Sequence, residues 1–255
     1  AALMDVEEAF TESRTPQEWQ RWIWEGSRQQ AAKEGIELPD WERFQRDGWV
    51  KVPVPETPTI MMEAFRKDPM ANPLDTPSGK IEIFSETIAG LGYEDCPGHP
   101  AWMEPVEWLG RAEPSQLHLI SNQPRNKLHS QFDHGSVSRA GRPKGVEPVT
   151  MHPDDAAARG LNEGQIVRIH NARGACMAEL ILSDAIRPKV IQIATGAWLD
   201  LDGQTCQHGN PNTLTIDKGT SRLAQGPIAQ SCLVEVDALR DSQAQHRAFS
   251  PPEIQ

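Results

Sequence analysis

The sequence predicts a mainly β protein in which the second half of the chain closes into a small barrel, preceded by helices and extended segments. Two observations favour the barrel. From about residue 115 onward, short alternating strands are separated by tight turns, and only one short helix lies between them. A parallel sheet needs a helix after almost every strand, so this pattern indicates a closed barrel instead.

Two helices near the start of the chain are predicted by their capping residues. Thr15 precedes Pro16 and has Glu18 three positions later, which is typical of a helix start, and Gly35 ends that helix. A second, shorter helix is expected over residues 40–48, between an aspartate and a glycine.

The rest of the first part predicts contacts with another domain. Valines alternate over residues 50–54, but prolines interrupt them and allow only an edge strand or an extended arm. Six of the eight tryptophans lie within residues 19–102, where no pattern of a closed core surrounds them. We therefore expect this part to pack against a neighbouring domain. A small helical subdomain is the alternative.

The elements of the barrel are predicted from alternation and turn residues. Pro153 and the two carboxylates after it mark the first turn of the one short helix, and Gly160 ends it. Residues 171–174 form a hairpin turn between two strands. The strands are predicted within residues 117–120, 163–170, 175–183, 190–193 and 232–236.

Composition excludes several classes of partner. The formal net charge of −11 opposes binding to nucleic acid and to anionic membrane surfaces. No run reaches the roughly 20 apolar residues of a membrane-spanning helix, so no membrane insertion is expected. Residues 1–10 lack the basic head and apolar run of a signal peptide, and the compartment stays open because an earlier targeting segment could have been lost.

The cysteines are expected to be reduced and to act as small buried apolar residues. They form no Cys-x-x-Cys pair, and their spacing fits neither a zinc site nor an iron–sulfur cluster. Common catalytic motifs are absent, and the pair Asp154–Asp155 is explained by its place in the first turn of a helix. The cysteines are Cys96, Cys176, Cys206 and Cys232.

Three polar, turn-rich segments suggest a ligand site. They cover residues 121–131, 195–198 and 208–226, and they are rich in amides, hydroxyls or glycines. Such groups suit a ligand with many hydrogen-bonding edges and phosphate oxygens, and the first segment adds two cations, Arg125 and Lys127. At strand ends of one small barrel, the three segments would converge on one rim and favour a polar cofactor.

Each segment also has a purely structural interpretation. Its composition is typical of turns that need no ligand. Taken alone, His129 or His208 is more often a structural histidine than a catalyst or a metal ligand.

The first and third polar segments belong to a longer set of motifs. These are found at residues 65–69, 76–82, 117–131, 148–156, 167–174, 208–215 and 219–226. Together they resemble the molybdopterin dinucleotide-binding domain of the dimethyl sulfoxide reductase family of molybdopterin oxidoreductases. The similarity extends from about residue 60 to the C-terminus and is greatest to the biotin sulfoxide reductase and trimethylamine N-oxide reductase branch.

The resemblance implies a more specific fold than the pattern alone. It implies a six-stranded double-psi β-barrel of the aspartate decarboxylase type with short helices, preceded by an α+β segment of neighbouring domains. Residues 113–240 would form the molybdopterin dinucleotide-binding domain. Residues 1–112 would be a partial segment of the central catalytic domains, and residues 241–255 a C-terminal tail.

The resemblance also implies a bis(molybdopterin guanine dinucleotide) molybdenum cofactor, shared with upstream domains that this sequence does not contain. The candidate cofactor contacts are Asn122, Gln123, His129, Ser130, Asn212 and Gln225. His129, Asn212 and Gln123 match positions that contact the pterin or its phosphates, although relatives often have histidine where Gln123 stands; the other three are inferred from neighbourhood. No catalytic residue or metal ligand is expected here, because an upstream serine holds the molybdenum in this branch.

The activity implied for the whole protein is removal of oxygen from a small S-oxide or N-oxide: biotin or methionine sulfoxide, trimethylamine N-oxide or dimethyl sulfoxide. Its partners would be the upstream domains of the same reductase and an unidentified electron donor, and this chain alone is predicted to be inactive. A biotin sulfoxide reductase would be cytoplasmic, and the other types periplasmic. The alternatives are a fragment of a formate dehydrogenase or nitrate reductase, and a non-catalytic barrel module.

Overall fold

The chain is described by a computed structural model that covers residues 4–54, 56–239 and 247–250. It divides into two compact units, residues 1–81 and residues 82–255. Most of the predicted C-terminal tail, residues 241–246 and 251–255, lies outside the described residues. Within those described ranges, no helix is both long enough and apolar enough to cross a membrane.

The two helices predicted in the first unit begin and end where their capping residues indicate. The Thr15 hydroxyl accepts a hydrogen bond from the Glu18 N–H, and the Thr15 N–H donates to the Glu18 carboxylate. Asp40 caps the next helix, which ends at Gly48 with a left-handed φ of +75°. Neither helix contains a buried residue. This exposure is consistent with packing against another domain, which stays a prediction. The helices are α1 (Glu7–Thr11), α2 (Pro16–Lys33), α3 (Trp41–Asp47) and α4 (Glu63–Lys67).

Residues 50–54 form an irregular arm. They contain no strand, and Val54 is 83% exposed, so the edge-strand alternative is wrong. The prolines lack the backbone N–H that strand pairing needs. Two short helices precede the barrel in the second unit, α5 (Glu86–Ala89) and the 3₁₀ helix η2 (Leu109–Arg111).

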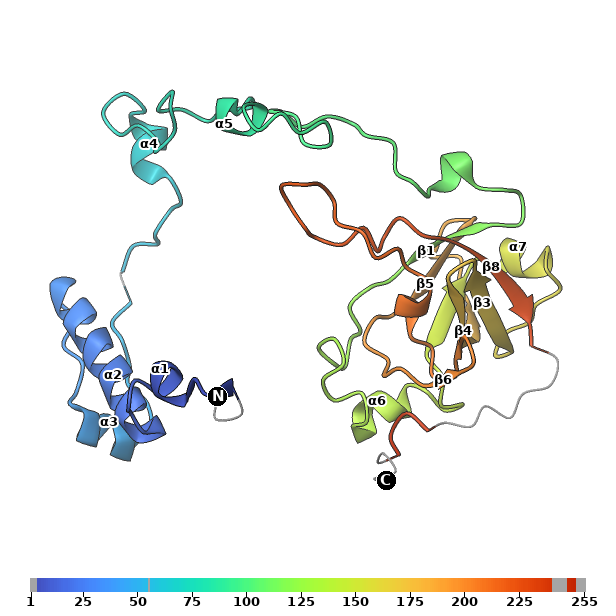
Figure 1. Ribbon diagram of the computed structural model, residues 1–255, viewed down its shortest axis with the longest axis horizontal. Helices are drawn as coiled ribbons and strands as arrows, with labels where there is room; N and C mark the ends of the chain where they lie inside the picture. Colours follow the sequence, from blue (N-terminus) through green and yellow to red (C-terminus); the bar gives the residue numbers. More distant parts are fainter. Residues whose placement is uncertain (1–3, 55, 240–246, 251–255) are drawn as a thin grey trace. The chain divides into compact units, whose positions relative to one another are not determined.

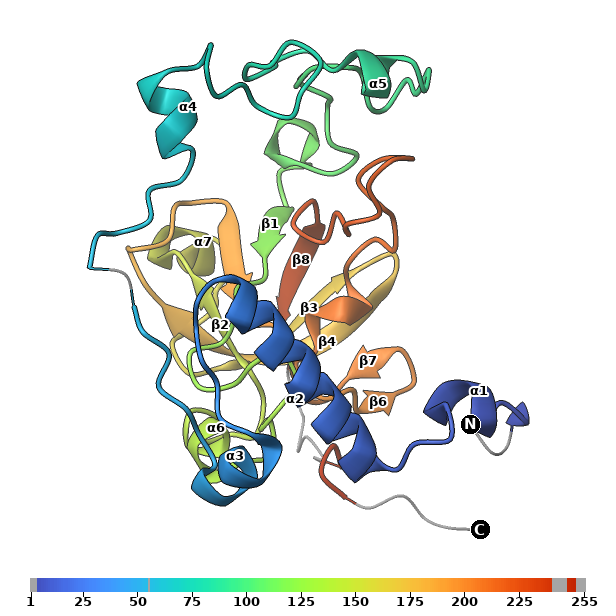
Figure 2. The same ribbon diagram turned by 90° about the vertical axis from the view of Figure 1, so that its left-hand side faces the viewer.

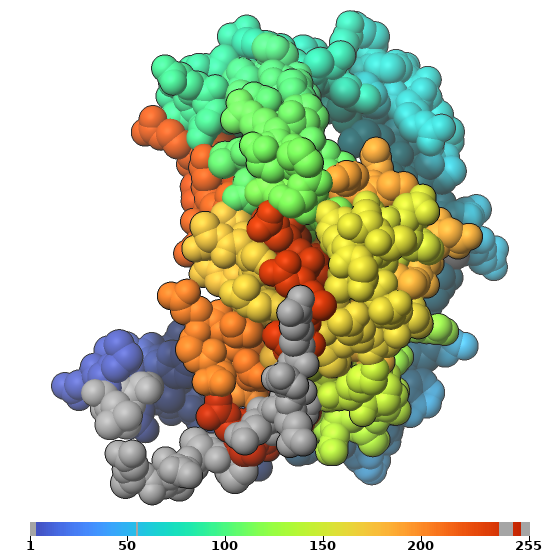
Figure 3. Space-filling model, turned by 90° about the vertical axis from the view of Figure 1, so that its right-hand side faces the viewer, coloured from blue at the N-terminus to red at the C-terminus, as the bar shows by residue number. Residues whose placement is uncertain are grey.

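Six strands of the second unit close into a barrel (Figures 1 and 2). They are β1 (Leu117–Ile120), β2 (Pro148–Met151), β3 (Ile166–Asn171), β4 (Gly174–Leu182), β5 (Val190–Ile193) and β8 (Leu233–Ala238). Around the ring their order is β2, β5, β1, β8, β3 and β4, and β4 pairs with β2 to close it. On the face in Figure 3, β8 reaches the surface as the red atoms beside the yellow β2–β3 connection.

The pairings of these strands have an internal symmetry. β1 pairs with β5, and β2 with β4, in parallel, whereas the other four pairings are antiparallel. If the first three barrel strands are exchanged in chain order with the last three, every pairing and its direction is reproduced. The two halves of the barrel are therefore interlocked, and the predicted six-stranded double-psi barrel is confirmed.

The strand pattern predicts five of the six barrel strands, and only the family resemblance implies the sixth. The pattern does not predict β2, which begins at Pro148 and is only four residues long, nor the hairpin of β6 (Leu201–Asp202) and β7 (Thr205–Cys206). The predicted helix is α7 (Pro153–Ala157), and Gly160 follows it with a left-handed φ of +65°.

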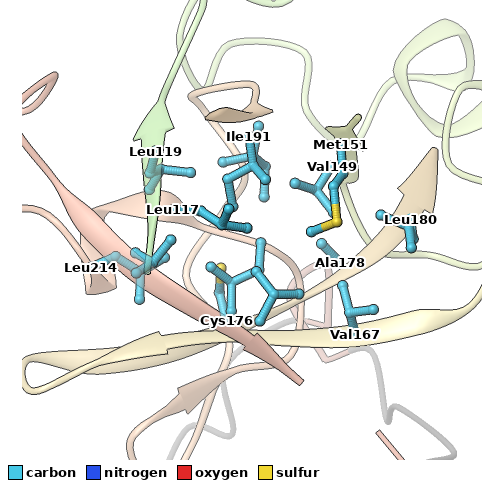
Figure 4. Packing of buried hydrophobic residues seen from close by; sticks show 14 of the residues in the cluster. Leu117, Leu119, Val149, Met151, Val167, Cys176, Ala178, Leu180, Ile191 and Leu214 are labelled. Atoms are coloured by element: carbon cyan, nitrogen blue, oxygen red, sulfur yellow. The ribbon is translucent and has the colours of Figure 1, made fainter. Parts of the chain in front are cut away.

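The core lies inside the barrel. Side chains from β1, β2, β4 and β5 point towards one another in Figure 4. Cys176, Cys206 and Cys232 belong to this core and form no disulfide. Burial raises the pKa of the Cys176 thiol far above its usual range and that of Cys232 to about 11. The thiols of Cys176 and Cys232 therefore stay protonated at neutral pH, and all three buried cysteines pack as small core residues, as predicted.

Candidate functional site

The polar segments meet at one end of the barrel because of the strand directions. Residues 121–131 follow β1, and residues 195–198 follow β5. These two strands are parallel neighbours, so the segments that leave them emerge side by side. Residues 208–215 follow the β6–β7 hairpin and contain the 3₁₀ helix η3 (Pro211–Thr213). We call these three segments the rim.

Hydrogen bonds join the first two segments of the rim. The Thr195 N–H donates to the Asn122 carbonyl at 2.9 Å. The indole Nε1 of Trp198 donates to the Ser130 carbonyl at 2.8 Å. The expected convergence of these segments is therefore confirmed.

The same two segments are interlocked at Gly196. A Cβ added there would lie 1.8 Å from the carbonyl oxygen of His129, and the φ of Gly196 is +92°. His129 itself has a φ of +50°, a left-handed conformation that non-glycine residues seldom adopt. The third segment joins through Asn210, whose side-chain amide donates to the Ala197 carbonyl at 2.8 Å. All three segments thus form one connected rim.

The predicted contact residues are all exposed, and most of them lie on the rim. Nε2 of Gln123 lies 3.3 Å from Nδ1 of His129, so these two side chains are brought together. Asn212 lies on η3, where its N–H donates to the Asn210 side chain at 2.9 Å. Gln225 is separate: it lies in the loop before β8, and its side chain donates to the Ser221 carbonyl at 2.8 Å. The described contacts do not connect Gln225 with the rim.

Lys127 does not face a ligand, which corrects the interpretation of the first segment. Its side chain is only 4% exposed, and its Nζ donates to Asp133 Oδ1 at 2.5 Å and also to the Glu147 carboxylate. The neighbouring cation Arg125 is exposed. Of the two cations in this segment, only Arg125 is available to phosphate oxygens.

Lys127 belongs to a set of charged side chains beneath the rim. Nη1 of Arg142 donates to Asp133 Oδ1 at 2.6 Å and to Glu147 Oε1 at 2.8 Å. Nε2 of His208 lies 3.0 Å from Asp133 Oδ2. All these side chains are at most 6% exposed. We call Lys127, Asp133, Arg142, Glu147 and His208 the buried ion cluster.

Asp133 is the centre of this cluster. Burial by itself raises its pKa, but hydrogen bonds with His208, Lys127 and the Trp198 N–H, together with the charge of Arg142, outweigh burial. The net effect lowers the pKa of Asp133 well below its usual range. Its carboxylate stays charged and ties the first rim segment to the other two.

Sequence reasoning missed Asp133, Arg142 and Glu147. Arg142 is nine positions from Asp133 and 66 from His208, so the cluster has no spacing that a motif could reveal. The one available signal is weak: these charges lie in a stretch of turns between β1 and β2. The structural interpretation of His208 agrees with its 1% exposure and its place in the cluster.

Two hydroxyls, one on the rim and one on the helix behind it, have hydrogen-bonding capacity that the described residues do not use. The hydroxyls of Thr195 and Ser138 are buried and have no hydrogen-bond partner among the described residues. Ser138 lines a hollow of about 180 Å³ behind residues 122–127. An unmatched buried polar group costs about 1–3 kcal/mol, so these groups fit a site completed by water or a polar ligand. In the described part of the chain, no three His, Cys, Asp or Glu residues are arranged to hold a metal ion.

Comparisons with known proteins identify the family of the barrel. The family model "Molydopterin dinucleotide binding domain" matches residues 117–233. Biotin sulfoxide reductase from Cereibacter sphaeroides is 46% identical over 239 residues, which are 92% of this chain and 32% of that protein. A dimethyl sulfoxide/trimethylamine N-oxide reductase from Rhodobacter capsulatus is 42% identical over 236 residues, or 89% of this chain and 29% of that protein.

The fold has a counterpart among solved structures. Acetylene hydratase from Pelobacter acetylenicus matches with a TM-score of 0.57 at 19% identity, over 79% of this chain and 28% of that chain. The chain spans about a third of the length of the curated relatives it matches.

Replacing Asp133 tests the buried ion cluster. Asp133→Asn leaves Lys127 and Arg142 buried with one carboxylate fewer, and we expect it to lower the free energy of unfolding by about 3–5 kcal/mol at pH 7. Because the folded pKa of Asp133 is lowered, its contribution is complete above the unfolded pKa of about 4 and is lost as pH falls towards the folded value. Urea unfolding at several pH values should therefore show the two proteins converging below about pH 4. The exposed Asp202→Asn is the control, and equal stability of all three proteins at pH 7 would contradict the prediction.

Replacing Gly196 tests the interlocked rim. Gly196→Ala brings a Cβ against the His129 carbonyl, whereas Gly203→Ala meets nothing within 4 Å at a similarly left-handed φ of +58°. Both variants have the backbone cost of a left-handed alanine, but only the first has the clash. We expect Gly196→Ala to be less stable than Gly203→Ala by about 1–3 kcal/mol in urea unfolding. Equal losses would show that the two loops are not held together at this point.

Proposed function

Because the chain belongs to the molydopterin dinucleotide-binding domain family, we propose that it is the C-terminal, cofactor-binding part of a reductase that removes oxygen from small S-oxides or N-oxides. The main support is the convergence of three polar segments on one rim of the barrel, within the residues that match this family. The named S-oxide and N-oxide reductases among its relatives support the reaction class. No observation favours a formate dehydrogenase, a nitrate reductase or a non-catalytic module.

The proposed cofactor is a bis(molybdopterin guanine dinucleotide) molybdenum group, shared with upstream domains of the same reductase. When bound, it would supply the two-electron chemistry of oxygen removal, while the protein orients it and donates hydrogen bonds. The exposed amide, imidazole and hydroxyl groups of the rim are the donor set that pterin edges need.

Five rim residues have proposed roles in holding this group. Gln123 and His129 are paired through one nitrogen of each side chain, so His129 Nε2, which has no partner among the described residues, stays available. The side-chain amide of Asn212 likewise makes no hydrogen bond with a described residue and can serve a phosphate or pterin edge. Asn122 and Ser130 flank these groups. Gln225 is kept in the proposal as a contact outside the rim.

Two substitutions in the full-length reductase test these roles. His129→Ala and Asn212→Ala each remove a proposed hydrogen bond, so we expect each to weaken cofactor binding about tenfold. The measurement is molybdopterin per polypeptide, read as the fluorescence of the released, oxidised pterin. Asp184→Ala, in an exposed turn between β4 and β5, is the matched control. Full cofactor content in both rim variants would overturn the proposed roles.

The proposed position of the metal ligand gives a further prediction. Since the proposed metal ligand lies upstream, the purified 255-residue chain should reduce no sulfoxide or N-oxide, even when molybdopterin cofactor and a reduced dye are supplied. Oxidation of the dye followed by absorbance is the assay, and full-length reductase is the positive control. Substrate-dependent turnover by the isolated chain would contradict this prediction.

A further inference from the structure

Residues 247–250 return to the barrel after its last strand. In Figure 1 this short red segment lies close to α6 (Ser136–Ala140), which follows the first rim segment in the chain. Phe249 and Ser250 line the same hollow as Ser136 and Arg139. The returning segment and α6 therefore face the same hollow.

A buried carboxylate binds this segment through a hydrogen bond and an ion pair. Asp200 is only 6% exposed, and it lies two positions after Trp198 of the rim. Its Oδ2 accepts a hydrogen bond from the Arg247 N–H at 2.6 Å, and its Oδ1 lies 3.5 Å from Arg247 Nε. Among the described residues, Arg247 supplies the hydrogen bond and the ion pair of this carboxylate. A buried carboxylate without a partner is costly, so Asp200 is matched to the returning segment.

The ring of Phe249 covers the buried ion cluster. Its centroid lies 4.9 Å from the His208 ring in an edge-to-face arrangement and 5.4 Å from the Trp198 ring. The guanidinium carbon of Arg142 lies 5.8 Å from the same centroid. An aromatic cover keeps water away from charged groups and so strengthens their hydrogen bonds.

We propose that residues 247–250 form a C-terminal clasp that holds the rim in shape. Phe249 contacts His208, which bonds to Asp133, and Asp133 in turn holds Lys127 and the Trp198 N–H. Phe249 is therefore a positioning residue for the first two rim segments. The effect of Phe249 on the cofactor rests on the proposed function, whereas the clasp itself does not depend on that function.

Hydrogen exchange of the full chain, followed by mass spectrometry, tests the clasp. Phe249→Ala removes the ring, Phe249→Tyr keeps it, and Phe10→Ala removes a 75% exposed ring from the first unit as the control. We expect Phe249→Ala to accelerate exchange about tenfold in peptides from residues 127–133 and 195–198. Residues 166–182, the β3–β4 hairpin, should exchange as before. Arg247→Ala should give a smaller acceleration in the same peptides.

The outcomes separate the clasp from the proposed function. Unchanged exchange at the rim, equal acceleration in the β3–β4 hairpin, or a failure of Phe249→Tyr to restore protection would each overturn the clasp. In the full-length reductase, Phe249→Ala should also release its pterin about tenfold faster, and Phe249→Tyr should not. Accelerated exchange without faster pterin release would uphold the clasp and count against the cofactor role of the rim.

Discussion

The rim depends on one carboxylate that is buried with its partners. Asp133 accepts hydrogen bonds from Lys127 in its own loop, from Arg142 beyond α6 and from the Trp198 N–H, and it lies within hydrogen-bond distance of His208. A charge in the interior is tolerated only when its partners are all present, so the segments that supply them must assemble together. The conformation of the exposed, proposed ligand-binding residues therefore depends on buried side chains beneath them.

The barrel supplies the fixed frame for this assembly. The loops that follow the parallel strands β1 and β5 leave the barrel at the same end. The β6–β7 hairpin is joined to β4 by the pairing of β7 with β4, and it leads to the third rim segment. Interior positions are occupied by apolar side chains and free cysteines, which leaves the polar groups to the loops. Such a division is common in proteins, because a rigid scaffold lets exposed loops hold the functional groups.

Local signals predicted much of the fold and only the exposed part of the site. Thr15 and Asp40 marked helix starts because caps act within one turn, and apolar or alternating runs located five strands, including the four-residue β1 and β5. β2 was not predicted because it begins at a proline, which is typical of a loop or a strand edge. Lys127 was misread because a lysine among amides looks solvated, whereas its partner Glu147 lies 20 positions away. Only the closed chain brings such partners together, so no spacing in the sequence indicates them.

The position of β8 has a consequence for how the molecule is made. This last strand fits between β1 and β3, and it pairs with β1 residues more than 110 positions earlier in the chain. During synthesis the ring therefore cannot close until β8 has left the ribosome, and the facing edges of β1 and β3 stay unpaired until then. A polypeptide released before residue 233 would expose these two edges to pairing with other chains, so we expect it to aggregate instead of forming a shortened barrel.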